Sequence, residues 1–176
     1  MKKSITLIFL LALSSSVLGQ SKDDVIEIIK VSGVAEVYFT YEAAKEKIRK
    51  IATGKPSPEV IVKFKDGVLE VDTKGEAHNE VVKVYVSSLN LKNIIVDDAA
   101  QFHGTNIINV ESLEITVDGH SSADLNVNTE NLKINMSGGD LTISGKSTNC
   151  EVIKYEGHEN GTLDFKNFDS KNSYVE

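Results

Sequence analysis

The sequence of 176 residues predicts an all-β protein: a right-handed parallel β-helix, or β-solenoid, with coils of about 19 residues, preceded by a β-rich N-terminal region with one short helix. Two observations lead to this prediction. Apolar and polar residues alternate along most of the chain, which is the pattern of strands with one buried face. In the second half this alternation recurs at a fixed spacing, which is the pattern of stacked coils.

Three glycines mark the repeat: Gly119, Gly138 and Gly157 are 19 residues apart, and Ala100 holds the preceding equivalent position. The residues two, four and six places before each glycine are mostly apolar, so we expect these columns to line the core. Glu151 interrupts one column. The structural repeat positions predicted in this way are Ile94, Val96, Leu113, Ile115, Val117, Gly119, Leu132, Ile134, Met136, Gly138, Ile153, Tyr155 and Gly157.

A second strand follows in each coil, at residues 123–127, 141–143 and 163–165. Coils of this length are too short for two strands and the helical crossover of a βαβ unit, so a solenoid is favoured. An antiparallel meander or sandwich tolerates a similar alternation and remains the alternative. Side chains expected to stack at solenoid corners are Asn126, Asn128, Asn131 and Asn149, and those expected to cap the open end are Phe165, Phe168 and Tyr174.

The first half of the chain is also rich in strand signals. Short β-rich runs at 25–29 and 34–39 flank a Ser-Gly turn, and a further alternating strand lies within 82–86. Residues 60–71 hold two strands across an Asp-Gly pair, which is a strong hairpin signal. Residues 42–51 are mostly good helix formers and predict the one short helix.

Residues 1–19 have the layout of a secretory signal peptide, because two lysines precede a short apolar run and small residues precede Gln20. The apolar run is too short to span a bilayer comfortably, which disfavours a membrane anchor. We therefore divide the chain into a signal peptide at 1–19, a β-rich N-terminal part at 20–90, and solenoid repeats with a C-terminal cap at 91–176. The last two parts are expected to form one continuous domain.

The composition of the chain restricts the classes of partner that the protein is expected to bind. The net charge of −7 argues against a nucleic-acid surface and against docking on an anionic membrane. We expect no membrane insertion after signal cleavage. An exported chain with the single cysteine Cys150 holds no internal disulfide, and packing in the core is the simplest role for that thiol.

Several segments resemble the repeat of the putative autotransporter-adhesin head domain family, the GIN or DUF2807 domain. The segments are 31–37, 66–71, 82–87, 113–119 and 132–145, and they cover most of residues 25–165 in order. The resemblance implies an exported β-helical protein of a Bacteroidetes-type envelope. It implies no established activity.

The search for chemistry returns no catalytic, cofactor-binding or metal-binding residues. The chain contains no nucleophile elbow, zincin motif, P-loop, dinucleotide fingerprint or paired CxxC. The four histidines His78, His103, His120 and His158 are interpreted as turn residues, although His103 with His120 and a nearby aspartate would suit a weak metal site. The acidic turn residues Asp97, Asp98, Asp118, Asp124, Asp140 and Glu156 include no pair fixed at a catalytic separation.

Three functions follow as hypotheses. The first is a non-enzymatic, adhesin-like protein of the cell envelope, in the periplasm, at the cell surface or secreted, that binds an unknown envelope protein or glycan. The second is a carbohydrate-active β-helix enzyme of the lyase or glycosidase type. The third is an assembly subunit that self-associates through its open solenoid end.

Overall fold

The computed structural model describes residues 25–44, 47–52, 59–74, 82–154 and 161–175, and these residues form strands and turns without a helix. The expected signal peptide lies outside the described residues. The prediction of an all-β solenoid is confirmed. The strands are β1 (Ile28–Val31), β2 (Ala35–Tyr41), β3 (Ile48–Ala52), β4 (Glu59–Lys65), β5 (Val68–Lys74), β6 (Val82–Ser88), β7 (Asn93–Val96), β8 (Gln101–Val117), β9 (Ser122–Met136), β10 (Asp140–Lys154) and β11 (Thr162–Val175).

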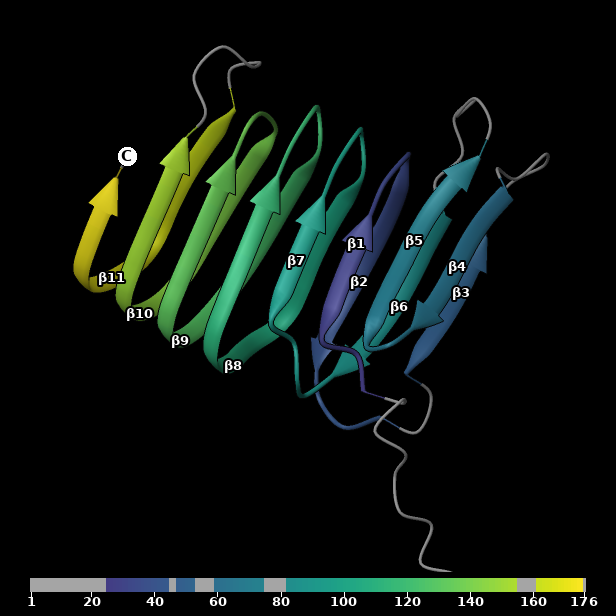
Figure 1. The fold of residues 1–176 in the computed structure, drawn as a ribbon, viewed down its shortest axis with the longest axis horizontal. Coiled ribbons are helices and arrows are strands. Elements are labelled where there is room, and N and C mark those ends of the chain that lie inside the picture. The colour runs from purple at the N-terminus through teal and green to yellow at the C-terminus, as the bar shows by residue number, and fades with distance from the viewer. Residues whose placement is uncertain (1–24, 45–46, 53–58, 75–81, 155–160, 176) are drawn as a thin grey trace, which may run out of the picture.

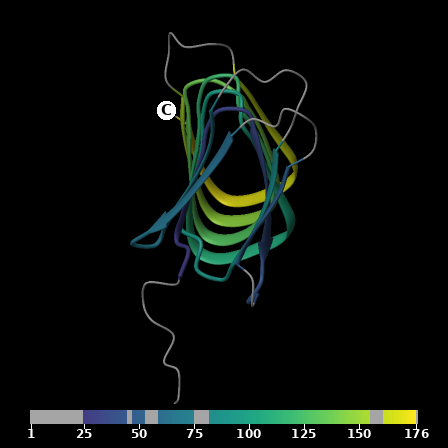
Figure 2. The same cartoon turned by 90° about the vertical axis from the view of Figure 1, so that its right-hand side faces the viewer.

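The strands wind into a flattened, right-handed tube with two walls (Figures 1 and 2). The front sheet holds β4, β5, β1 and β7 and the second halves of β8 to β11. The back sheet holds β3, β6 and β2 and the first halves of β8 to β11. Each long strand runs along the back sheet, bends at a corner and continues in the front sheet, so one coil contributes to both walls.

The winding order differs from the chain order at the N-terminal end. β1 lies between β5 and β7, and pairs with both in parallel. β2 lies in the same way between β6 and β8. The first coil of the chain is therefore inserted between two coils that come later in sequence. At this end β3 pairs antiparallel with β6, and β4 pairs antiparallel with β5, so the edges of both walls differ in direction from the parallel coils.

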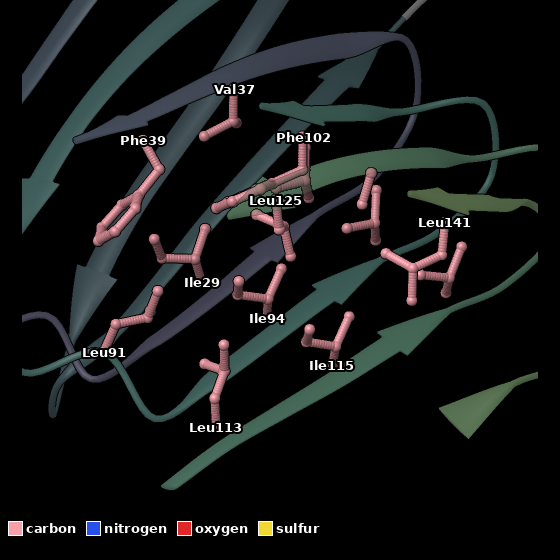
Figure 3. Close-up of a cluster of buried hydrophobic side chains, with 14 of the residues drawn as sticks. Ile29, Val37, Phe39, Leu91, Ile94, Phe102, Leu113, Ile115, Leu125 and Leu141 are labelled. Carbon is pink, nitrogen blue, oxygen red and sulfur yellow. The ribbon is translucent and has the colours of Figure 1, made fainter. Parts of the chain in front are cut away.

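The core is the narrow space between the two sheets, filled by apolar side chains from alternate positions of every strand. In Figure 3, Ile94 and Ile115 of the front sheet point towards Phe102 and Leu125 of the back sheet. All four of these side chains are buried. Each coil adds one such layer, so the hydrophobic stabilisation of the fold grows layer by layer along the tube.

The register shows that the length of the repeat varies from coil to coil. Ile115 pairs with Ile134 at the same spacing as the glycines, whereas the step from Ile94 to its partner Ile115 is longer. Ile134 then pairs with Val152, so Val152 is buried and Ile153 is turned to the outer face beside Asn135. The core column is therefore Ile94, Ile115, Ile134 and Val152, and the expected place of Ile153 is corrected by one residue.

Turn length explains this correction. Four residues separate Val117 of β8 from Ser122 of β9, whereas three residues separate Met136 of β9 from Asp140 of β10. The shorter turn brings the chain back into the sheet one residue earlier, and a one-residue shift exchanges the two faces of a strand.

The glycine column is also reassigned at its first position. Gly138 lies over Gly119, but the residue stacked before Gly119 is Asp98, with a φ of 59°, and not Ala100. Ala100 is one of the buried side chains. Tyr155 and Gly157 lie outside the described residues. The remaining repeat positions, Val96, Leu113, Val117, Leu132 and Met136, are buried.

Two local expectations of the sequence are wrong and one is right. Residues 48–51 of the helix expected at 42–51 belong instead to strand β3, because pairing with β6 outweighs the helix propensity of this segment. Residues 162–175 form β11, a further coil layer rather than a cap folded across the end. The Asp66-Gly67 hairpin between β4 and β5 is confirmed, and both turn residues have positive φ.

Candidate functional site: a groove along the solenoid corner

A short repeated motif builds the corner where each coil passes from the back sheet to the front sheet. In Thr129-Glu-Asn131, Ser147-Thr-Asn149 and Ser170-Lys-Asn172, the hydroxyl donates to the backbone carbonyl of the asparagine at 2.9, 2.7 and 2.8 Å. The single proton of each of the Thr129 and Ser147 hydroxyls is shared with a second carbonyl, that of Glu111 or Glu130 in the preceding coil. These buried hydroxyls satisfy carbonyls that the bend removes from the sheet.

The same motif places asparagine side chains in register outside the corner. The Asn172 amide donates to Asn149 Oδ1 at 2.9 Å, and Asn149 donates to Asn131 Oδ1 at 2.9 Å. Asn131 donates to Ser112 Oγ at 3.4 Å. We call this row of four side chains the asparagine ladder. The expected stacking of Asn131 and Asn149 is thereby confirmed, and Asn128, which donates to Asn109 at 2.8 Å, forms a separate pair.

A groove with a volume of about 1000 Å³ runs along the asparagine ladder on the outside of the front sheet, and we call it the corner groove. This volume is at the upper end of what small-molecule sites usually have. Its lining comes from the end of β2, from the loop before β7 and from β7 to β11, so the groove follows the solenoid axis. The residues that line it are Tyr41, Leu89, Asn90, Leu91, Lys92, Asn93, Asn109, Val110, Glu111, Ser112, Leu113, Glu114, Asn131, Leu132, Lys133, Asn149, Cys150, Glu151 and Tyr174.

Four of the five charged side chains that line the corner groove have partners among the described residues, the exception being Glu111. Lys92 pairs with Glu27 at 2.9 Å, and Lys133 lies 3.9 Å from Glu151. The Glu114 carboxylate accepts amide hydrogen bonds from Asn93 and Asn135 at 2.7 and 3.0 Å. Neutral amide and hydroxyl groups therefore provide much of the hydrogen-bonding capacity that remains for a ligand.

Apolar surface is concentrated at the two ends of the groove. Leu89 is 44% exposed at the β7 end, and Tyr174 is 63% exposed at the β11 end. An exposed tyrosine offers both a flat apolar face and a hydroxyl, a combination that recognition surfaces use often.

Four of the acidic residues expected in turns have structural roles, whereas Asp124 lies within strand β9. Asp97 accepts the backbone N–H of Asp98, Asp118 accepts that of Gly119, and Asp140 accepts that of Thr162. Asp98 in turn accepts the N–H of Gly33 from a neighbouring coil. These carboxylates hold the turns in place and form no arrangement of two facing acids. Glu156 lies outside the described residues.

The histidines take two different positions. His103 lies on the outer face of the back sheet and stacks on Tyr38, whereas His120 is exposed in the turn after β8. His78 and His158 lie outside the described residues. Within the described part of the chain, no three His, Cys, Asp or Glu side chains gather as a metal-binding group would.

Cys150 occupies the inner column next to Leu132 and is 2% exposed. Burial raises the pKa of its thiol above the ordinary value, so the side chain stays protonated and unreactive at neutral pH. This agrees with the packing role expected from the sequence.

The back sheet carries a second feature, which we call the tyrosine row: the Arg49 guanidinium and the rings of Tyr85, Tyr38 and His103 follow one another on four neighbouring strands. Tyr38 stacks on Tyr85 at 5.3 Å and on His103 at 5.0 Å, and Arg49 covers the other face of Tyr85 at 4.8 Å. The faces of the two tyrosine rings are thus already covered by neighbours, which suits sheet stabilisation better than ligand stacking.

Lys83 completes this row. It donates to the Tyr38 hydroxyl at 3.2 Å and pairs with Glu36 at 3.3 Å. The hydrogen bond to Tyr38, followed by that to Glu36 and its charge, raises the pKa of Lys83 above its ordinary value. Lys83 is therefore a cation held in place on the outer surface.

Sequence reasoning missed the corner groove. The available signal was the recurring Ser/Thr-x-Asn pattern that begins at Thr129, Ser147 and Ser170, whose uneven spacing did not match the glycine period. The tyrosine row was not detectable in the same way, because its members come from strands that are ordered differently in space and in sequence.

Comparisons with known proteins agree with the fold. Among solved structures, the chain is similar to a putative adhesin from Bacteroides fragilis NCTC 9343, with 15% identity and a TM-score of 0.69 over 88% of this chain and 72% of that chain. It is similar to a putative adhesin from Parabacteroides merdae ATCC 43184, with 19% identity and a TM-score of 0.57 over 86% and 73% of the two chains.

A putative lipid binding protein from Parabacteroides distasonis ATCC 8503 is also similar, with 13% identity and a TM-score of 0.56 over 87% and 74% of the two chains. At these identities the likeness shows the fold alone. No curated protein matches the sequence. No helix in the described part of the chain has the length and apolarity to cross a membrane.

The family comparison covers nearly all of the solenoid. The model of the family described as putative auto-transporter adhesin, head GIN domain, matches residues 27–176. This range contains every strand of the structure, from β1 to β11. The resemblance seen in the sequence is therefore confirmed, and the chain belongs to the DUF2807 family of head GIN domains.

Proposed function

We propose that this protein is an exported, adhesin-like binding protein without catalytic activity, and that the corner groove is its binding surface. The family is described as putative auto-transporter adhesin, head GIN domain, and that description supports an exported or surface location. The observation that carries the proposal is the corner groove itself, where the asparagine ladder provides aligned hydrogen-bonding groups beside exposed apolar side chains.

The absence of catalysis is supported by the use of the carboxylates. A glycosidase needs two carboxyl groups on opposite sides of a scissile bond, with different protonation states. In the turns, Asp97, Asp118 and Asp140 each accept a backbone N–H. In the groove, Glu114 accepts two amide hydrogen bonds, and Glu151 lies beside Lys133.

The test combines a binding assay with an activity assay. The chain without residues 1–19 is incubated with envelope fractions and with immobilised glycans, and both bound protein and newly released reducing ends are measured. We expect retention on at least one surface without release of reducing ends. Retention on none of the surfaces would refute the binding role, and turnover would establish the enzyme alternative.

The assembly role is a second candidate, because β11 is an exposed edge strand. Phe165 and Val175 pair with the inward residues Ile143 and Val152, yet they are 40% and 71% exposed because the described residues place no further layer on them. An exposed apolar edge favours pairing with a second copy of the chain. Sedimentation of the wild type and of a Val175→Lys variant tests this: a dimer that dissociates in the variant supports assembly, and a monomeric wild type refutes it.

A further inference from the structure

We infer that the corner groove binds one strand of a neutral, linear oligosaccharide laid along the solenoid axis; this inference rests on the proposed function and names its ligand class. Three features of the groove lead to it: a direction and a spacing, unused hydrogen-bonding capacity, and a balance of charge. Each feature is present in the described residues.

The groove has a repeating spacing because its lining residues come from neighbouring strands. Along the outer face, Asn93 pairs with Glu114, Glu114 with Lys133, Lys133 with Glu151, and Glu151 with Tyr174. Neighbouring strands are ~4.8 Å apart, so the four steps from β7 to β11 span roughly 19 Å. A ligand with its own linear repeat meets one lining side chain in the same register at each step, and a glycan chain has such a repeat.

The asparagine ladder leaves hydrogen-bonding capacity for that ligand. A primary amide has two N–H donors and two carbonyl lone pairs. Asn149 uses one N–H to reach Asn131 and one lone pair to accept from Asn172. Asn131 likewise uses one N–H to reach Ser112 and one lone pair to accept from Asn149. Each of these two amides therefore keeps one donor and one acceptor, a pairing that suits the adjacent hydroxyls of a sugar.

The ladder also fixes the orientation of these amides. Each side chain donates towards the preceding coil, so oxygen and nitrogen cannot exchange places without breaking two hydrogen bonds. A ligand that binds here does not have to order the asparagine side chains first. Such preorganisation lowers the entropy cost of binding.

Charge selects a neutral glycan over an acidic one. Both groove lysines are paired with glutamates, Lys92 with Glu27 and Lys133 with Glu151. Glu111 and Glu114 add two further carboxylates to the lining. A uronic-acid or sulfated polymer would meet more negative than positive charge in the groove, and like charges brought together in an interface are unfavourable.

A peptide strand fits the groove less well. Extended peptides bind sheets by adding a strand at a free edge, through backbone hydrogen bonds. The groove crosses the outer faces of β7 to β11, and the backbones of β8, β9 and β10 are paired on both sides. Side-chain amides and the exposed Tyr174 ring remain as contacts, and these suit hydroxyl groups and the apolar face of a sugar ring.

The experiment is a titration of the chain without residues 1–19 with three hexasaccharide probes, followed by calorimetry. The probes are cellohexaose and the hexamer of N-acetylglucosamine, both neutral, and the hexamer of galacturonic acid, which is acidic. We expect at least one neutral hexamer to bind and the acidic hexamer not to bind. Binding of the acidic hexamer alone, or of no hexamer, would overturn the inference.

Substitutions in the asparagine ladder test whether the neutral hexamer binds in the corner groove. The double variant Asn131→Ala, Asn149→Ala removes the amides of two consecutive coils, and we expect the Kd for the neutral hexamer to rise about tenfold or more. Asn128→Ala is the control, because it removes an asparagine side chain that is hydrogen-bonded to the neighbouring coil, through Asn109, but does not itself line the groove. Equal Kd values for the double variant and the wild type would overturn the assignment to the groove.

Folding does not confound this result, because Tyr174→Ala gives an independent measurement. Tyr174 is 63% exposed on an edge strand, so its loss leaves the core intact while removing the ring at the β11 end of the groove. We expect weaker hexamer binding with an unchanged melting temperature, and unchanged affinity would count against the inference. Retention on envelope fractions with no hexamer binding would refute the glycan class and leave the proposed function standing.

Discussion

The two neighbouring residues Val152 and Ile153 provide the sharpest test of the solenoid register. Val152 completes the buried column above Ile134 and is 2% exposed, whereas Ile153 is half-buried on the outer face. Val152→Ala removes two methyl groups at ~0.8 kcal/mol each and leaves a small cavity, which gives a loss of about 2 kcal/mol. Ile153→Ala removes more carbon atoms but from the outer face, and we expect a loss below about 1 kcal/mol.

Thermal unfolding measures this difference directly. For a chain of this size, 1 kcal/mol corresponds to about 2–4 °C in Tm, so Val152→Ala is expected to melt about 4–8 °C below the wild type. Ile153→Ala is expected to stay within about 4 °C of the wild type. The opposite order, with Ile153→Ala the less stable variant, would show that the strict glycine period holds in this coil and that the register described here is wrong.

Three further predictions concern the core, the corner and alkaline pH. Ile134→Asp places an unpaired charge in the central column and is expected to unfold the chain, as seen by loss of the cooperative melt; a wild-type melt would contradict its inward position. Thr129→Val keeps the shape but removes the one hydroxyl proton that the carbonyls of Glu111 and Asn131 share, and we expect a loss of about 1–3 kcal/mol of unfolding free energy in denaturant titrations. Because burial raises the pKa of Cys150, its contribution to stability is complete below the unfolded value near 9.0 and is lost as pH rises above it. Cys150→Ala should therefore show a shallower fall in unfolding free energy above that pH, and identical slopes for both proteins would refute this.

The solenoid was predictable because the sequence contains both of its periods, the two-residue alternation of apolar and polar residues and the 19-residue spacing of glycines. Alternation with period two follows from the opposite faces of a strand, and the glycine spacing holds where Ile115 stacks under Ile134. The register of the other coils was less predictable, because the length of a turn can vary as long as apolar side chains still face the core. The turn before β10 lacks one residue, and the register moves from Ile153 to Val152 as a result.

Local propensity failed where tertiary pairing decided the outcome. Residues 48–51 were predicted as part of a helix, but the edge of β6 was available for pairing, and Ile48 pairs there with Val86. The candidate site was hidden for a related reason. The corner hydroxyls and asparagines form their hydrogen bonds only when β8, β9, β10 and β11 are stacked, because each bond joins residues from consecutive coils or across one bend.

The insertion of β1 between β5 and β7 determines how the chain can be shortened and in what order it can fold. Ile28 pairs with Val68 and with Asn93, so the earliest strand has no neighbour in its sheet until β5 has been synthesised, and gains its second only with β7. Loss of β11 would merely make the tube one layer shorter. Loss of β1 and β2 would remove a layer from the middle and leave two stacks with no strand to join them. The first strand is therefore held on both sides only after β7 is present, and the long sequence separation of these pairings favours slow folding.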